Sequence, residues 1–143
     1  MSACTFFGHR DCPSSVKTKL RAALIDLIEN HAVDMFYVGQ QGSFDAMVRS
    51  VLKELVTVYP HINYVVVLER MPQKRDDFDT HNFSDTLLPE GIETVHPRYA
   101  IDRRNRWMLQ QSEYVVTYIR HPWGGAAKFA SEAKRLGKNV VEL

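Results

Sequence analysis

Residues 114–130, with the sequence YVVTYIRHPWGGAAKFA, decide the fold because they join a β-prone run to an Ala-rich helix through a glycine turn. The run YVVTY is typical of a buried strand. Gly124 and Gly125 let a ligand approach the backbone closely, and the free N–H groups of the next helix favour an anion. Because a glycine pair also forms ordinary tight turns, the other loops decide whether this turn is a phosphate site.

The same succession of strand, turn and helix runs through the chain. Apolar residues at helical spacing predict helices with starts and ends set by caps, prolines and glycines: from Ser14 or Ser15 to about residue 31, from the N-cap Ser43 to about residue 56, over residues 99–111, and from residue 126 to Gly137. Short β-prone runs predict strands at residues 5–7, 35–38, 64–68, 92–95, from residue 114, and at 140–141.

This alternation predicts an α/β domain with a Rossmann-like, mainly parallel sheet and helices on both faces. Right-handed crossovers favour the strand order 3-2-1-4-5. A chain of 143 residues suits a single domain, residues 1–143. Residues 70–89 are charged and polar, with prolines near both ends, and predict a long loop, either a lid over a site or a solvated excursion.

Composition limits the classes of partner. The formal net charge of +1 gives no electrostatic footprint for DNA or an anionic membrane, and no apolar run reaches the roughly 18 residues of a membrane span. Cys4 and Cys12 lack a metal or redox spacing, and the six histidines show no ligand motif, so neither metal nor cofactor is expected. A cytoplasmic protein with reduced thiols is expected, and its apolar helix faces leave room for a homo-oligomer.

Candidate ligand-binding residues gather in the loops after the strands, which share one edge of such a sheet. Gly8, His9 and Arg10 follow the first strand, and Arg10 either binds a phosphate or pairs with Asp11. The loop after the second strand contributes Gly39, Gln40, Gly42, Ser43 and Asp45.

For two of the candidate residues, Asp45 and Trp123, a structural role competes with ligand binding. Asp45 either holds a ribose hydroxyl or favours the start of its helix electrostatically. Of the polar residues 103–106 near the start of the third long helix, only Arg104 and Asn105 are predicted to point into the site. The glycine turn adds Pro122 and Trp123, and Trp123 either stacks on a base or packs beneath the loop.

Four segments, FFGHRDCP, GQQGSFDAMV, RNRWMLQQSEYVVTY and HPWGGAAKFA, follow one another along the chain. Together they resemble the SLOG superfamily, which joins the Smf/DprA DNA-processing proteins and the LOG-type phosphoribohydrolases, and in particular its small YpsA-like branch. FFGHRDCP is similar to the first-strand signature of that branch, and RNRWMLQQSEYVVTY to a helix and strand of Smf proteins. GQQGSFDAMV and HPWGGAAKFA stand where relatives carry glycine-rich loops. The resemblance implies a Rossmann-like fold that binds a nucleotide or nucleotide-derived ligand, with its phosphate on the glycine turns.

The chain departs from the LOG pattern at residues 126–129, AAKF, where those enzymes carry a threonine and a glutamate. The obvious carboxylate for glycosidic cleavage is therefore absent. We expect a small nucleotide-binding sensor or regulatory module. One alternative is a nucleotide N-glycosidase or phosphoribohydrolase in which Asp45 or Glu69 has taken over. A second, less favoured because the charge balance is near neutral, is a single-stranded nucleic-acid binder that uses Arg103, Arg104, Arg106 and Trp123.

Overall fold

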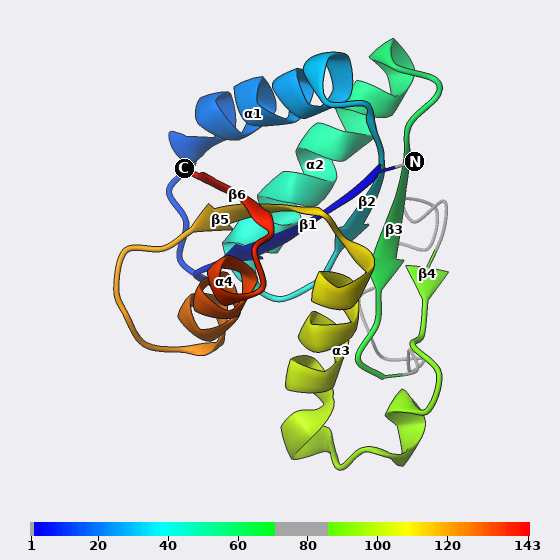
Figure 1. Ribbon diagram of the computed structural model, residues 1–143, viewed down its shortest axis with the longest axis vertical. Coiled ribbons are helices and arrows are strands. Elements are labelled where there is room, and N and C mark those ends of the chain that lie inside the picture. The colour runs from blue at the N-terminus through cyan, green and yellow to red at the C-terminus, as the bar shows by residue number, and fades with distance from the viewer. Residues whose placement is uncertain (1, 71–85) are drawn as a thin grey trace.

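A computed structural model describes residues 2–70 and 86–143 (Figure 1). The described strands form a six-stranded sheet in the order β4-β3-β2-β1-β5-β6, and every neighbouring pair is parallel. The strands are β1 (Ser2–Gly8), β2 (Val33–Val38), β3 (Asn63–Val67), β4 (Thr86–Leu87), β5 (Tyr114–Tyr118) and β6 (Asn139–Glu142). The helices are α1 (Val16–Asn30), α2 (Gly42–Val58), the short 3₁₀ helix η1 (Ile92–Thr94), α3 (Pro97–Gln111) and α4 (Gly125–Arg135).

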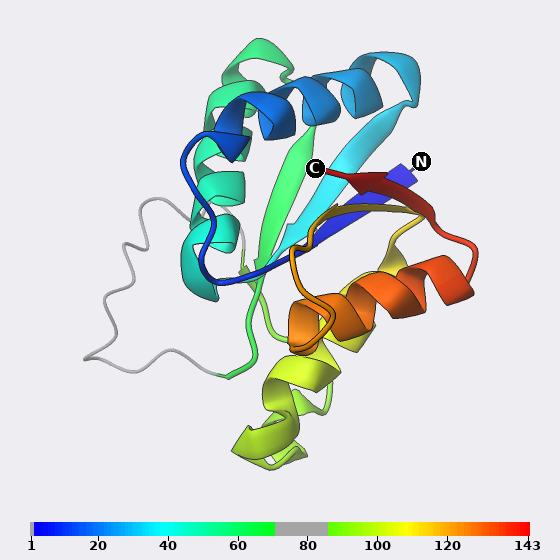
Figure 2. The ribbon, with the colours of Figure 1, turned by 90° about the vertical axis from the view of Figure 1, so that its left-hand side faces the viewer.

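The helices cover both faces of the sheet, with α1 and α2 on one side and α3 and α4 on the other (Figure 2). Successive side chains of a strand point to opposite faces, and β1 shows this directly. Phe6 packs in the α1 and α2 layer and stacks on Phe36, whereas Phe7 stacks on Phe129 of α4 at 5.4 Å between ring centroids. Burial of each of these rings stabilises the fold by roughly 1.5–3 kcal/mol.

This architecture confirms the predicted α/β class, the parallel sheet and the helices on both faces. The five longer strands lie in the predicted order, and β4 adds a short strand at the β3 edge. β4 falls within the predicted loop at residues 70–89, of which residues 71–85 lie outside the described part of the chain. No helix among the described residues combines the length and the apolarity needed to cross a membrane.

The strand predicted at residues 92–95 is wrong, because this segment forms η1. Gly91 precedes it with a φ of 80°, in the left-handed region that favours glycine. The N–H groups of Thr94 and Val95 then donate to the carbonyls of Gly91 and Ile92, three residues earlier. These local bonds replace a strand ladder, and they turn the chain towards the start of α3.

The prediction that Ser43 caps α2 is also wrong. Gln41 occupies the N-cap position, and its N–H donates to Oδ2 of Asp45 at 2.9 Å. The Ser43 hydroxyl instead donates to the carbonyl of Arg10 at 2.5 Å and accepts from the N–H of Cys12 at 2.7 Å. Ser43 therefore ties the loop after β1 to the start of α2, which fixes two of the predicted site loops relative to each other.

Candidate ligand-binding site

A cavity of about 650 Å³ lies at the carboxyl edge of the sheet, within the range of about 300–1,000 Å³ typical of small-molecule sites. The ends of β1 and β5 form one wall, and the starts of α2 and α4 and the length of α3 from Arg98 to Met108 form the others. This is the edge where ligands bind in open parallel sheets. Its lining includes Gly8, His9, Arg10, Asp11, Gln41, Asp45, Arg98, Ile101, Asp102, Arg104, Asn105, Met108, Tyr118, Arg120, His121, Gly124, Gly125 and Ala126.

The glycine turn faces open space inside this cavity. Gly124 is the N-cap residue of α4, and its φ of 95° requires glycine. Gly125 is the first helical residue and has no such requirement, and a Cβ added there would meet nothing within 4 Å. Neither backbone conformation nor packing within the described chain explains glycine at position 125. The bare backbone there leaves room for a ligand at the positive end of the helix dipole.

Three exposed arginines, Arg10, Arg98 and Arg120, surround this open space. Arg120 is held in place, because its Nη1 donates to the carbonyls of Ile119 and Leu143 and its guanidinium lies 4.3 Å from the ring centre of Tyr118. The alternative that Arg10 pairs with Asp11 is not found among the described residues. These arginines bring three positive charges to a lining that also carries the carboxylates of Asp11 and Asp102.

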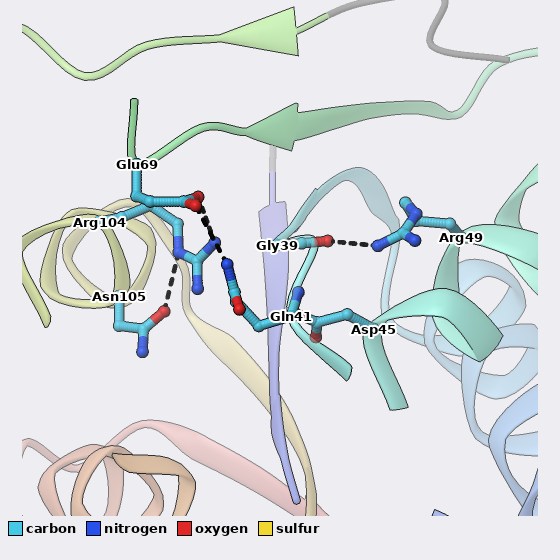
Figure 3. A network of polar contacts seen from close by, with 7 residues as sticks. All are labelled: Gly39, Gln41, Asp45, Arg49, Glu69, Arg104 and Asn105. Atoms are coloured by element: carbon cyan, nitrogen blue, oxygen red, sulfur yellow. Dashed lines mark hydrogen bonds and ion pairs between the residues drawn. The ribbon is translucent and has the colours of Figure 1, made fainter. Parts of the chain in front are cut away.

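The floor of the cavity is a buried polar network (Figure 3). Arg104 is 2% exposed; its Nε donates to Oδ1 of Asn105 at 3.0 Å, and its Nη1 lies 3.4 Å from Oε2 of Glu69. The side-chain amide of Gln41 donates to the other Glu69 oxygen at 3.0 Å. Asp45 completes the network from α2. The network joins the start of α2, the segment that follows β3, and α3.

Gly39 lies behind this network. A Cβ at Gly39 would stand 2.8 Å from both Nη1 of Arg104 and Oδ2 of Asp45. Its carbonyl accepts a hydrogen bond from Nη1 of Arg49 at 2.9 Å. Gly39 therefore lets the guanidinium and the carboxylate approach each other, and it does not itself line the cavity.

Burial controls the charge states in the floor. Desolvation raises the pKa of Asp45, and the Gln41 N–H and the Arg104 and Arg49 guanidinium groups only partly oppose this. Burial likewise lowers the pKa of Arg104, although Asp45 and Glu69 oppose it. Asp45 is thus a carboxyl group that holds its proton to higher pH than an ordinary aspartate. Such a group in a cavity is suited to hydrogen bonding with a ligand or to proton transfer.

Two histidines stand at the edge of the cavity. His9 and His121 stack with ring centroids 3.6 Å apart, and Nε2 of His9 accepts the N–H of His121 at 3.3 Å. Because Nε2 accepts, His9 is neutral with its proton on Nδ1. Burial, followed by His121 and Arg120, lowers the pKa of His9 and keeps it neutral. His121 in turn donates from Nδ1 to the carbonyl of Trp123 at 3.0 Å.

The structure brings most of the predicted site residues together. Those that line the cavity are Gly8, His9, Arg10, Asp45, Arg104, Asn105, Gly124 and Gly125. Others lie outside its lining: Gly39, Gln40, Gly42, Ser43, Pro122 and Trp123. A Cβ on Gly42 would stand 2.6 Å from Cα of Arg10, and Pro122 lines a separate cavity of about 380 Å³.

Sequence reasoning missed several residues of the site. Gln41 stands between predicted positions and is brought into the floor by its bond to Glu69. Arg120 and His121 come shortly after β5, and this position behind a buried strand is the sequence signal that could have indicated them. Arg98 belongs to α3 because the helix begins at Pro97, earlier than predicted, and its N–H donates to the ring of the N-cap residue His96. Asp102 lies within the predicted helix but was not singled out.

No protein-family model matches the sequence, and no curated protein matches it. Within residues 2–70 and 86–143, no group of three or more His, Cys, Asp or Glu side chains is placed to hold a metal ion.

Proposed function

We propose that this protein binds a nucleotide or nucleotide-derived ligand in the cavity and acts as a small sensor or regulatory module of the SLOG type. The observation that carries the proposal is the open space over Gly125 at the start of α4, next to Arg10, Arg98 and Arg120. Backbone N–H groups and guanidinium groups both suit a phosphate. We assign the phosphate to the part of the cavity where the glycine turn and these arginines lie.

The floor supplies hydrogen-bonding groups for the remainder of such a ligand. Asp45 and Asn105 are each 8% exposed. Within the described part of the chain, Oδ1 of Asp45 and Nδ2 of Asn105 have no hydrogen-bond partner. One is an acceptor and the other a donor. A ribose hydroxyl both donates and accepts, so a sugar placed between them satisfies both groups.

Titration calorimetry with adenine nucleotides, NAD and ADP-ribose tests the proposal. We expect saturable binding to at least one of them, which Gly125→Val abolishes by filling the space over the turn. Ala22→Val adds comparable bulk at an exposed position of α1 and is expected to bind like the wild type. Absence of binding to every ligand in the panel would sink the proposal.

A second candidate function is N-glycosidic cleavage of a nucleoside monophosphate, and the raised pKa of the cavity-lining Asp45 is the observation that favours it. A carboxyl group with a pKa nearer neutrality is able to act as a general acid. Chromatographic detection of free base tests this candidate, and Asp45→Asn is expected to abolish the release. Binding without any release of base would leave the sensor function alone.

Direct binding of single-stranded nucleic acid gains less support. Arg104 is committed to the cavity floor, whereas Arg103 and Arg106 are exposed on α3. The guanidinium of Arg106 lies 5.6 Å from the ring centre of Phe129, in a packing role. Cytoplasmic location and homo-oligomer formation stay predictions.

A further inference from the structure

Three aromatic rings form a continuous column at the edge of the cavity: His9, His121 and Trp123, which we call the ring column. His9 and His121 are 3.6 Å apart between centroids with an interplanar angle of 16°, and His121 and Trp123 are 4.0 Å apart at 18°. His9 and His121 line the cavity, and Trp123, which is outside the lining, stacks on His121. The column therefore runs from the cavity outwards.

Trp123 ends the column with a large exposed ring, since 67% of the residue is accessible to solvent. Its inner face is covered by His121, whose ring Nδ1 also donates to the Trp123 carbonyl. His121 is itself held by the stack and the hydrogen bond to His9. An exposed indole is thus fixed in orientation, although the chain buries little of its apolar surface in doing so.

The residue after Trp123 is Gly124, so the ring is covalently adjacent to the turn assigned to the phosphate. In a nucleotide, a planar base is joined to the phosphate through a sugar of a few bonds. A phosphate at Gly124 and Gly125 therefore keeps a base of the same ligand within reach of the column. Stacking on an aromatic side chain accepts any base, because every base has a π face.

We propose that the outer face of Trp123 is a base-stacking subsite, on which a base of the ligand adds a fourth ring to the column. This inference rests on the proposed nucleotide function and deepens it, because it makes the base a recognised part of the ligand. The site then distinguishes base-containing nucleotides from sugar phosphates that share the phosphate and the ribose. It favours no single base by hydrogen bonding at this subsite.

Tryptophan fluorescence gives a direct readout, since the chain has two tryptophans. Trp107 is half-buried against Tyr37, at 5.3 Å between ring centroids, and Trp107→Phe leaves Trp123 as the single reporter. AMP and NAD serve as base-containing probes and ribose 5-phosphate as the base-free probe. We expect saturable quenching with at least one base-containing probe and none with ribose 5-phosphate. If Trp107→Phe fails to fold, the difference in quenching between wild type and Trp123→Phe gives the same information.

Calorimetry on Trp123→Ala supplies the energetic test. We expect the Kd of the base-containing probe to rise by roughly 5- to 150-fold, as for loss of one stacked base, and that of ribose 5-phosphate to stay unchanged. Leu136→Ala removes another exposed apolar side chain, at the end of α4, and is the matched control. Binding of nucleotides with unchanged Trp123 fluorescence and an unchanged Kd in Trp123→Ala would overturn the subsite alone. Absence of binding to any phosphate compound would remove the proposed function as well.

Discussion

Nη1 of Arg104 lies 3.4 Å from Oε2 of Glu69, in an ion pair whose side chains are only 2% and 13% exposed. The pair joins α3 to the chain that leaves β3 and places a guanidinium in the floor of the cavity (Figure 3). Two charges taken out of water stabilise a fold only when they are well compensated. The floor is therefore sensitive to the loss of either partner.

Glu69→Gln is expected to destabilise the protein, because it removes the charged partner of the buried Arg104. Of the two carboxylates near Arg104, only Asp45 then remains. A loss of about 2 kcal/mol in the free energy of unfolding is expected, as for a charge-assisted hydrogen bond. Urea unfolding measures it. Asp102→Asn breaks the half-exposed pair with Lys128 and is expected to cost under about 1 kcal/mol. Equal losses in the two variants would contradict the role given to the Arg104–Glu69 pair.

Two glycine-to-alanine substitutions are expected to have opposite effects on stability. Gly39→Ala drives a methyl group against Arg104 and Asp45 and is expected to cost about 1–3 kcal/mol of stability, as other overpacking changes do. Gly125→Ala meets no atom and improves helix propensity, so stability is expected to hold or to rise by up to about 1 kcal/mol. Thermal unfolding of both variants makes the comparison. A stability loss in Gly125→Ala would show that position 125 serves packing.

Stability is expected to fall with acidification through His9. Its folded-state pKa is lowered below the ordinary 6.5, so the unfolded chain binds the proton more readily. The contribution of His9 is complete above about pH 6.5 and is lost as the pH falls below that value. His9→Gln, which keeps an acceptor for the His121 N–H, is expected to flatten the dependence of the unfolding free energy between pH 7 and 5. An unchanged slope, equal to that of the exposed control His61→Gln, would contradict this assignment.

Asp45→Asn is expected to lower ligand affinity without lowering the stability of the protein. Because burial raises the folded-state pKa of Asp45, its contribution is present at low pH and is lost as the pH rises above the ordinary 3.8. The neutral amide avoids that loss and still accepts the Gln41 N–H, so unfolding at pH 7 is expected to need as much denaturant or more. Ligand affinity is expected to fall at least about tenfold, because the charged acceptor is gone. A variant that unfolds more easily yet binds normally would reverse this account.

The spacing of apolar residues predicted the helices and strands, because the buried side of each element is visible in its own local sequence. The continuous apolar runs of β2, β3 and β5 and the spaced apolar residues of α1 and α2 are local signals. They placed the candidate loops at one edge of the sheet. Arg104 and Asn105 were chosen from the polar run at residues 103–106, and the structure places both on the buried side of α3 with Met108.

The predictions for Ser43 and for residues 92–95 were wrong for different physical reasons. Ser43 has the chemistry of an N-cap, yet the carbonyl of Arg10 and the N–H of Cys12 take its hydroxyl. Residues 92–95 have the composition of a strand, but Gly91 starts a turn, and the segment is separated from the sheet edge that β4 occupies. Gln41 and His121 acquire their places from partners far away along the chain. No local pattern contains those partners.

The Ser43 hydroxyl ties the loop that carries Arg10 to the first turn of α2, which carries Asp45, so these two segments are expected to move together. A ligand group that binds Arg10 is therefore expected to change the free energy needed to hold Asp45 in its position in the floor. Two fragments of the ligand, a free phosphate and a free nucleoside, are accordingly expected to bind with positive cooperativity. By reciprocity each tightens the other by the same factor.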